Sequence, residues 1–579
     1  IFLLALALHA SAESLDERYI AGLNERRLFS LAEAQCRRLL ADQNLTPDEQ
    51  IEITIALCRT YAEHALNTPR SERDELWNAA TATVEEFRRA APDSPRAILV
   101  EMQLALTILA RGELARQEAE VGAPGAPSLE EARRELLAAD QQLEKVGEET
   151  ERLLREVGRN PRAEMSEQEL ISLQRNIDYQ KARALRNQAL CYPAKSPERS
   201  DALIRALSKL GPLAQSRTAD SLVWDARIDE ATCLRLRGQL AEAAARLDKL
   251  EETRPPSKIA LLARAERARI YLDARRADEA LQVLRAGREI GGRTAAELDL
   301  AHVETYVAKW KQASEAKNQQ QAEAWQQQAV GMIKGMESLY GPYWTRRGEM
   351  LLAASAGASG SEDVEILLRT AKNHYLRKEY TEAIGAYDRA GQAALQSGDK
   401  KRAFDLLHAA ALIERSHGQR YDAIARYRNV AIQLPDNPKA AAVHLQATLD
   451  AAQLARDGTS KSLADYVALL QEHIKTWPDQ PSTDKARLWL AKLKEHERDW
   501  VAALAAYKGV SPADESQYAS AIDGAARCYQ QLLSGLREAG DRELPAAANR
   551  AARYLENILL AGDTPLPKRV EPPGRSAAL

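Results

Sequence analysis

Apolar residues recur every three to four positions along most of the chain, which is the period of an α-helix and not of a β-strand. Stretches such as GLNERRLFSLAEAQCRRLL (22–40) and DELWNAATATVEEFRRA (74–90) show this spacing clearly. No alternation of apolar and polar residues persists over the length of a strand. The pattern therefore predicts an all-α fold with essentially no β-structure.

Pairs of alanines twelve residues apart mark five helical hairpins, each with an apolar or aromatic residue four positions after the second alanine. The five sets are Ala231/Ala243/Leu247, Ala268/Ala280/Leu284, Ala371/Ala383/Tyr387, Ala411/Ala423/Tyr427 and Ala491/Ala503/Tyr507. Small side chains on two facing helices let their axes approach closely. The residue four positions further on shares a face with the second alanine and fills the space beside it.

Three similar tetrapeptides, PDSP (92–95), PDNP (435–438) and PDQP (478–481), follow helical stretches. Proline is disfavoured inside a helix and tolerated at its first position, where the missing N–H needs no partner. We expect the first proline of each tetrapeptide to end one helix. The second one (Pro95, Pro438 or Pro481) would open the next helix.

These features resemble the tetratricopeptide repeat (TPR) family, most clearly in residues 224–256 and 409–440. The repeat period here is nearer 40 than the usual 34 residues, and the tryptophan and glycine typical of helix A are mostly absent. The resemblance implies a right-handed α-solenoid of TPR-like hairpins, with some longer helix pairs interspersed. The alternative, generic alanine-rich antiparallel helices, keeps the same fold class.

In TPR proteins the concave surface is lined by the first helix of each hairpin and docks proteins or peptides. Carried over to the matched units, that surface would include a mainly cationic set of residues: Arg235, Arg269, Lys372, Tyr375, His408, Arg415, Lys492 and His496. The alternative is that these residues are ordinary solvated helix faces. The Asn/Lys/Arg set with which some TPR domains clamp a C-terminal carboxylate is incomplete, which argues against a simple C-terminal peptide as ligand.

These sequence patterns divide the chain into seven segments. We predict a truncated signal peptide over 1–12, helical hairpins over 13–125, a long helical pair over 126–200, TPR-like repeats over 201–295, extended helices and a Gly-rich hinge over 296–360, a C-terminal TPR-like array over 361–561 and a disordered Pro-rich tail over 562–579. Ser166 and Glu169 have the spacing of a capping box at the start of the second long helix.

The first twelve residues, IFLLALALHASA, form a short apolar run that ends in a small-x-small site suited to signal peptidase. The alternative is the start of a buried helix. Because the run begins without Met or a basic region, we expect further residues before it, and we expect the mature chain to be periplasmic or secreted. No other segment is apolar enough to span a membrane, so none is predicted in the mature chain.

Composition and charge narrow the classes of partner. Hydrophobic residues make up 45% of the chain and aromatic residues only 5%, and the formal net charge is −4. Such a composition suits closely packed helices. Without a strong basic field the chain has no electrostatic means of holding nucleic acid, so protein or peptide partners are expected.

The sequence contains no motif that would support catalysis or cofactor binding, so we predict no enzyme activity, cofactor or metal. Two SxxK matches, Ser314–Lys317 and Ser482–Lys485, stand without companion motifs. The five cysteines are too sparse for a disulfide scaffold, although Cys36–Cys58 or Cys191–Cys233 could pair on neighbouring helices.

We therefore predict a non-enzymatic protein–protein interaction scaffold of the bacterial cell envelope that docks partners on a concave TPR surface. The alternative is an auxiliary, non-catalytic part of a larger envelope assembly, such as a glycan-processing enzyme or an outer-membrane assembly complex.

Overall fold

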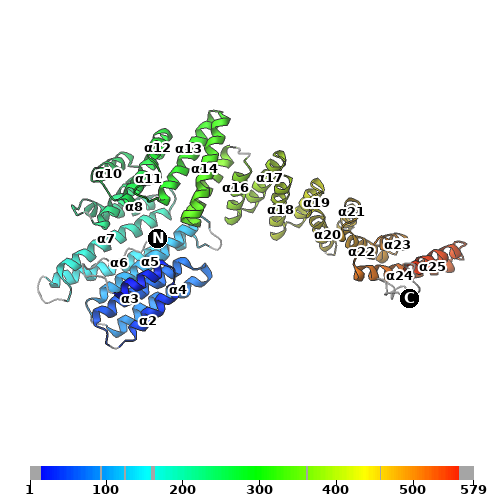
Figure 1. Cartoon of the computed structure of the whole chain (residues 1–579), viewed down its shortest axis with the longest axis horizontal. Helices are drawn as coiled ribbons and strands as arrows, with labels where there is room; N and C mark the ends of the chain where they lie inside the picture. Colours follow the sequence, from blue (N-terminus) through cyan, green and yellow to red (C-terminus); the bar gives the residue numbers. More distant parts are fainter. Residues whose placement is uncertain are drawn as a thin grey trace. The chain divides into compact units, whose positions relative to one another are not determined.

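The computed structural model describes residues 15–42, 44–91, 94–122, 126–157, 164–218, 220–359, 363–456, 458 and 460–559. In this part of the chain the regular elements are helices, joined by turns and by one isolated bridge between Ile290 and Arg293. The all-α fold is therefore confirmed (Figure 1). The predicted signal peptide and the predicted Pro-rich tail lie outside the described residues. The chain divides into two compact units, Ile1–Gly360 and Ser361–Leu579, which are described separately.

The N-terminal unit contains helices α1 to α15. Their bounds are α1 Leu15–Glu25, α2 Phe29–Leu40, α3 Pro47–Asn67, α4 Arg70–Ala90, α5 Ala97–Glu120, α6 Leu129–Val157, α7 Glu167–Leu190, α8 Pro197–Ala214, α9 Ser221–Leu236, α10 Leu240–Glu252, α11 Ser257–Asp273, α12 Ala277–Leu284, α13 Ala296–Glu315, α14 Gln319–Tyr340 and α15 Pro342–Ser359. Each helix packs on the next, and α3, α5, α7, α9, α11, α13 and α15 also pack on one another in that order. These seven form one inner layer of the unit.

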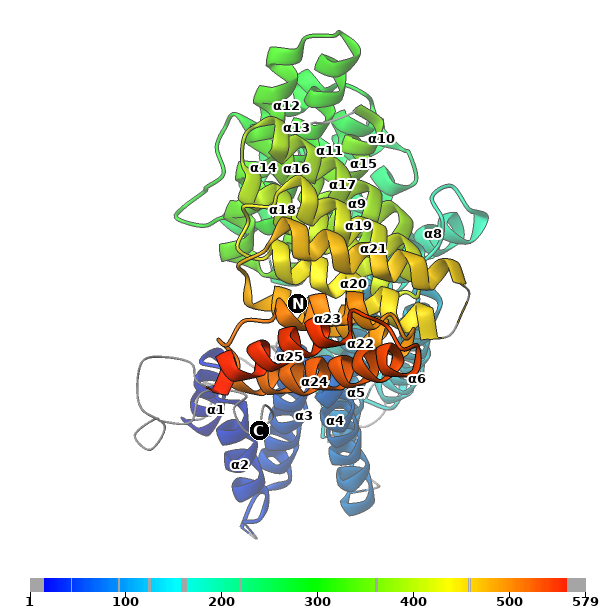
Figure 2. The ribbon, with the colours of Figure 1, turned by 90° about the vertical axis from the view of Figure 1, so that its right-hand side faces the viewer.

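The C-terminal unit contains helices α16 to α25. Their bounds are α16 Val364–Leu376, α17 Tyr380–Gln396, α18 Lys400–Ser416, α19 Arg420–Gln433, α20 Ala440–Arg456, α21 Ser460–Thr476, α22 Pro481–His496, α23 Trp500–Lys508, α24 Glu515–Glu538 and α25 Leu544–Leu559. Successive helices of this unit lie side by side in both views (Figure 1, Figure 2). Both units are thus α-solenoids of TPR-like helical hairpins.

The paired alanines lie at the centre of the hairpins, as predicted. All ten are completely buried, and each pair joins two packed helices: α9·α10, α11·α12, α16·α17, α18·α19 and α22·α23. Leu247, Leu284, Tyr427 and Tyr507, four positions after the second alanine, are at most 1% exposed. Tyr387 packs at the edge of the core as a partly buried residue. The small residue and its large neighbour therefore set the spacing of each hairpin.

Replacing Ala423 with leucine should destabilise the C-terminal unit by about 1–3 kcal/mol, because the added atoms have no room between α18 and α19. Ala425→Leu, an exposed position on the same helix, is the matched control. Urea unfolding of both variants measures the difference. Equal stability of the two variants would contradict the close packing at Ala423.

The turn inside a hairpin repeats one conformation. After α9, Gly238 has a φ of 83°, and the N–H of Gln239 donates to the carbonyl of Leu234 at 3.0 Å. The same left-handed turn precedes α17, where Lys378 has a φ of 63°. It closes the helix end by satisfying carbonyls that have no partner within the helix. These turns separate α9 from α10 at Gly238 and α16 from α17 before Tyr380.

The three proline-containing tetrapeptides agree with the prediction at one of three places. Pro481 is the first residue of α22, as expected. The prediction was wrong for Pro95 and Pro438, since α5 begins at Ala97 and α20 at Ala440. In both cases a hydrogen-bonded turn stands between the proline and the helix: Ala97 N–H donates to Ser94 at 3.0 Å, and Ala440 N–H donates to Asn437 at 2.9 Å. Residues 92–93 lie outside the described residues.

The longer helices also follow the sequence signals. The predicted capping box opens α7, where Ser166 Oγ accepts from the N–H of Glu169 at 3.2 Å and the Glu169 carboxylate accepts from the N–H of Ser166 at 2.7 Å. Helices α13 and α14 are extended helices within the segment 296–360, where such helices were expected. Helix α15 continues through most of the Gly-rich segment to Ser359, next to the boundary between the units.

All five cysteines are buried free thiols, so neither possible disulfide forms. Burial raises the pKa of the Cys58 thiol to about 11 and that of Cys191 to about 11. A protonated buried thiol acts as a small apolar residue, which is how these cysteines pack. Within the described residues no helix is both long and apolar enough to cross a membrane.

Candidate protein-docking groove

A groove with a volume of about 2100 Å³ runs along the N-terminal unit. It is lined mainly by the inner layer, from α3 through α5, α7, α9, α11 and α13 to α15, together with residues of α1. Small-molecule pockets usually measure about 300–1,000 Å³. A groove of this volume that follows successive hairpins has the size and the course of a site for a polypeptide segment.

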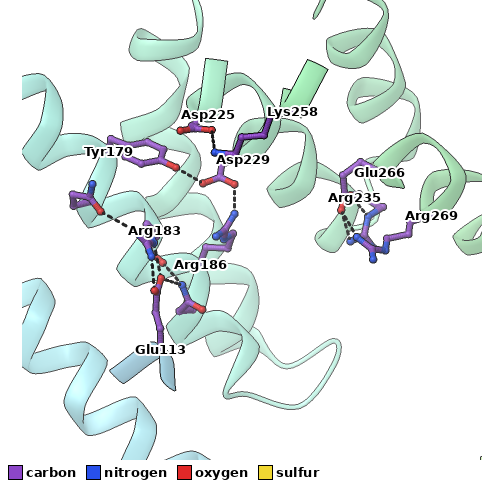
Figure 3. Close-up of polar contacts among 12 residues, drawn as sticks. Glu113, Tyr179, Arg183, Arg186, Asp225, Asp229, Arg235, Lys258, Glu266 and Arg269 are labelled. Atoms are coloured by element: carbon purple, nitrogen blue, oxygen red, sulfur yellow. Dashed lines mark hydrogen bonds and ion pairs between the residues drawn. The ribbon is translucent and has the colours of Figure 1, made fainter. Parts of the chain in front are cut away.

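Ion pairs connect neighbouring helices across the floor of the groove (Figure 3). Glu113 on α5 accepts two hydrogen bonds from Arg183 on α7, at 2.6 and 2.5 Å. Further along, Arg186 on α7 pairs with Asp229 on α9. The next steps join α9 to α11 through Arg235–Glu266 at 2.6 Å, and α11 to α13 through Arg269–Glu304 at 2.9 Å. We call these four pairs the inner ladder.

Glu266 is the centre of the inner ladder because two arginines share it. Its side chain is 7% exposed, and it pairs with Arg235 at 2.6 Å and with Arg269 at 3.1 Å. Burial opposes its ionisation, but the two guanidinium groups outweigh burial and lower the pKa of Glu266 to about 2. The same contacts raise the pKa of Arg235 despite its burial. Glu266 is therefore ionised at neutral pH.

Arg235 and Arg269, two of the predicted docking residues, do line the groove. Their guanidinium groups are held by Glu266, Asp273 and Glu304, and only 13% of either side chain is exposed. These two arginines therefore position neighbouring hairpins. Sequence reasoning identified the face they occupy but not the acids that neutralise them.

The other predicted docking residues lie on the C-terminal unit. Lys372 and Tyr375 are exposed on α16, with the Tyr375 ring 5.9 Å from that of Tyr380. His408 on α18 is half-buried beside Tyr427 at 5.6 Å, and burial lowers its pKa. The remaining three are exposed: Arg415 on α18, Lys492 on α22 and His496 on α22.

Arg415 pairs with a buried acid on a neighbouring helix. Its guanidinium pairs at 2.8 Å with Asp450 on α20, whose side chain is only 4% exposed. An acidic substitution at Arg415 would therefore leave a buried carboxylate facing a second one. Arg415 consequently has a structural role in addition to any part in docking.

One wall of the groove was not predicted from the sequence. At the start of α15, Tyr343 donates to the carboxylate of Glu120 at 2.9 Å, and Arg347 pairs with the same carboxylate at 3.0 Å. Arg346 donates to the carbonyl of Val121 at 3.4 Å. We call these contacts the α15 clasp, because they join α15 to the end of α5.

The α15 clasp also presents aromatic surface to the groove. The rings of Tyr343 and Trp344 meet edge to face at 5.1 Å, and the Arg347 guanidinium lies 5.7 Å from both rings. Tyrosine, tryptophan and arginine are the residue types enriched at binding hot spots. The signal in the sequence was PYWTRR at 342–347, an aromatic and basic cluster in a chain with few aromatic residues.

A chain of hydrogen bonds in the C-terminal unit contains Ser482, one of the SxxK serines. Ser482 Oγ lies 3.0 Å from His473 Nε2, the two Nδ1 atoms of His473 and His444 are 3.3 Å apart, and His444 Nε2 lies 3.0 Å from Glu472. The order resembles a catalytic triad with an added imidazole. Burial, together with His444, lowers the pKa of His473 to about 4, so it is a poor general base at neutral pH.

Among the described residues, no group of three or more His, Cys, Asp or Glu side chains could hold a metal ion. The groove in the N-terminal unit therefore remains the candidate site with the best-defined geometry.

Comparisons with known proteins do not assign this chain to a family. No family model matches the sequence, and no curated protein does. Among solved structures, the APC/C hetero-tetramer Cut9–Hcn1 aligns over 91% of this chain and 99% of that chain, with 14% identity and a TM-score of 0.23. Yeast Tom70 aligns over 89% of this chain and 95% of that chain, with 12% identity and a TM-score of 0.20. With TM-scores this low, neither structure supports a residue correspondence or a shared function.

Proposed function

We propose that the protein is a non-enzymatic interaction scaffold and that the groove of its N-terminal unit holds a segment of a partner polypeptide. The observation that carries this proposal is the groove of about 2100 Å³ lined by successive inner helices. Stacked helical hairpins characteristically create an extended concave surface of this kind, and proteins built from them use it for binding.

The inner ladder supports the proposal through rigidity. Each ion pair ties one inner helix to the next, so the groove keeps its shape in the absence of a ligand. A preorganised surface loses less conformational entropy on binding than a flexible one. The aromatic surface of the α15 clasp supplies apolar area at one wall.

The proposed location is the bacterial cell envelope, on the periplasmic side or outside the cell. It is supported by the signal-like residues 1–12. Fusing the whole N-terminal coding region through residue 30 to a reporter that is active only outside the cytoplasm tests the location.

Site-specific photo-crosslinking tests the proposed function. A photoreactive amino acid at Ala308, which lines the groove, should crosslink a partner from envelope extracts. The same amino acid at Lys145, which is exposed on α6 and does not line the groove, is the matched control. With the photoreactive amino acid moved to Lys311, which also lines the groove, Ala308→Trp narrows the groove and should abolish capture. Equal crosslinking from both positions, or capture that survives Ala308→Trp, would contradict docking in the groove.

The exposed face of the C-terminal unit is proposed as a second docking surface, formed by Lys372, Tyr375 and Lys492. Tyr375 is 43% exposed and offers apolar area with a hydrogen-bonding tip. Lys492→Glu tests this surface without disturbing the Arg415–Asp450 pair. A partner that meets it with acidic residues should associate more slowly with the variant.

A further inference from the structure

Three cations that line the groove have no hydrogen-bonded or ion-paired acid among the described residues: Arg27, Arg199 and Lys311. Arg27 and Lys311 are exposed, so water solvates their charges. Arg199 is half-buried at the start of α8. It is therefore the groove cation for which the absence of a counter-charge matters.

The surroundings of Arg199 make its unpaired positive charge more unfavourable. Burial and the nearby guanidinium of Arg235 lower the pKa of Arg199, whereas the pKa of Arg235 and Arg269 in the inner ladder is raised by their acids. The acids close to Arg235 are already engaged, since Glu266 and Asp273 both pair with it. A partly desolvated cation without a partner is unfavourable unless an anion reaches it.

The backbone holds Arg199 in place at this wall of the groove. The N–H of Arg199 donates to Oγ of the capping residue Ser196 at 3.2 Å, and Pro197 is the first residue of the helix. The backbone from which the Arg199 side chain extends is therefore fixed before any ligand binds. Its guanidinium presents donors in a planar fork that matches a carboxylate.

We infer that Arg199 is the specificity-determining residue of the groove and receives the side-chain carboxylate of an aspartate or glutamate in the docked polypeptide. The inner ladder neutralises its own charges, and the charges of Arg27 and Lys311 are solvated at exposed positions. The groove therefore fits a polypeptide segment that is largely uncharged and contains one internal acidic residue. This inference rests on the proposed function, because it names the ligand of the same groove.

A random 12-residue peptide library, joined to a coat protein through its C-terminal end, provides the probe. In this format side chains are the only source of carboxylates within the peptide. Binders are selected on the full chain, and those blocked by Ala308→Trp are kept as groove ligands. Each is then synthesised with an amidated C-terminus, and each Asp or Glu is replaced in turn by Asn or Gln.

Affinity is measured for wild type, Arg199→Gln and Lys145→Gln. On wild type, one acid-to-amide replacement should weaken binding at least tenfold, because charge-assisted hydrogen bonds are among the stronger polar contacts. On Arg199→Gln the same replacement should change affinity less than twofold. Lys145→Gln should keep the full tenfold discrimination, since Lys145 does not line the groove. Arg199→Lys keeps the charge but loses the planar set of donors. This variant should therefore keep part of the discrimination between the acidic peptide and its amide.

The outcomes distinguish the proposed docking in the groove from the inferred role of Arg199. Groove ligands whose acidic positions respond equally in wild type and Arg199→Gln would overturn the role of Arg199 and leave the docking groove in place. Selected peptides that all bind despite Ala308→Trp, or a library that yields no groove ligand, would contradict both. Arg199→Gln should melt at the wild-type temperature or above it, because it removes an unpaired half-buried charge. A clear fall in the melting temperature would show that Arg199 has a partner within the fold.

Discussion

Glu266→Ala should destabilise the N-terminal unit by about 3–5 kcal/mol, the usual cost of removing one partner from a buried ion pair. The reason is that both Arg235 and Arg269 then remain in the floor of the groove with one carboxylate fewer between them. The effect should be local, so hydrogen exchange in α9 and α11 is the appropriate measurement. Amides of these helices should exchange much faster in the variant than in wild type.

Glu279→Ala is the matched control for this prediction. Glu279 also pairs with an arginine, Arg276, at 2.8 Å, but 55% of the Arg276 side chain and 40% of the Glu279 side chain are exposed. Exposed pairs contribute little to stability, so exchange should stay close to that of wild type. If Glu266→Ala and Glu279→Ala behaved alike, the inner ladder would not be a structural element of the groove.

Acidification from pH 7 to pH 4 should weaken the C-terminal unit by about 3 kcal/mol through His473 alone. The pKa of His473 is about 4 in the fold, below its usual value of 6.5, so the unfolded chain takes up the proton first. The stability that comes from the neutral ring is therefore complete above pH 7 and is lost as the pH falls through 6.5 toward 4. The pKa of His444 is also lowered by burial, so it contributes with the same sign.

Charged and polar groups from three helices surround this pair of histidines. Glu472 of α21 accepts from His444 and from Arg428 of α19, and Ser482 of α22 contacts His473. Trp477 packs on both rings at 5.1 and 5.2 Å. Because Glu472 is already paired with Arg428, it only partly offsets the cost of a second cation.

Hydrogen exchange of α20 to α22 at pH 7 and pH 4 measures this dependence locally. The local readout matters because His302 in the N-terminal unit also has a pKa lowered to about 4. His473→Gln should flatten the pH dependence in α20 to α22, whereas His496→Gln, at an exposed position, should not. A pH dependence that is identical in the two variants would exclude the histidine pair as its source.

The hairpin cores were predictable because they depend on local spacing. Ala423 and Tyr427 lie on one face of one helix, and Ala411 lies twelve residues before Ala423, so the sequence alone places them together. The helix starts at the proline-containing tetrapeptides were less predictable. Whether Pro438 begins a helix depends on a turn from Asn437 to Ala440 that competes with the first helical turn.

The inner ladder was not predictable for a different reason. Glu266 and Glu279 have similar neighbours in sequence, yet one is buried between two arginines and the other is exposed. The difference arises from stacking of separate hairpins, which sequence periodicity does not specify. The same holds for Arg199, whose lack of a partner depends on which acids Arg235 engages.

The α15 clasp has a consequence for the order in which the N-terminal unit forms. Tyr343 and Glu120 are 223 residues apart in the chain, whereas the ladder pair Arg235–Glu266 spans 31 residues. Solenoids assemble by propagation between neighbours, with each hairpin a small loop closure. The clasp requires the whole array from α5 to α15 to be in place, so it should form last and open first. A unit that would otherwise fold hairpin by hairpin thereby acquires a final step that depends on all of them at once.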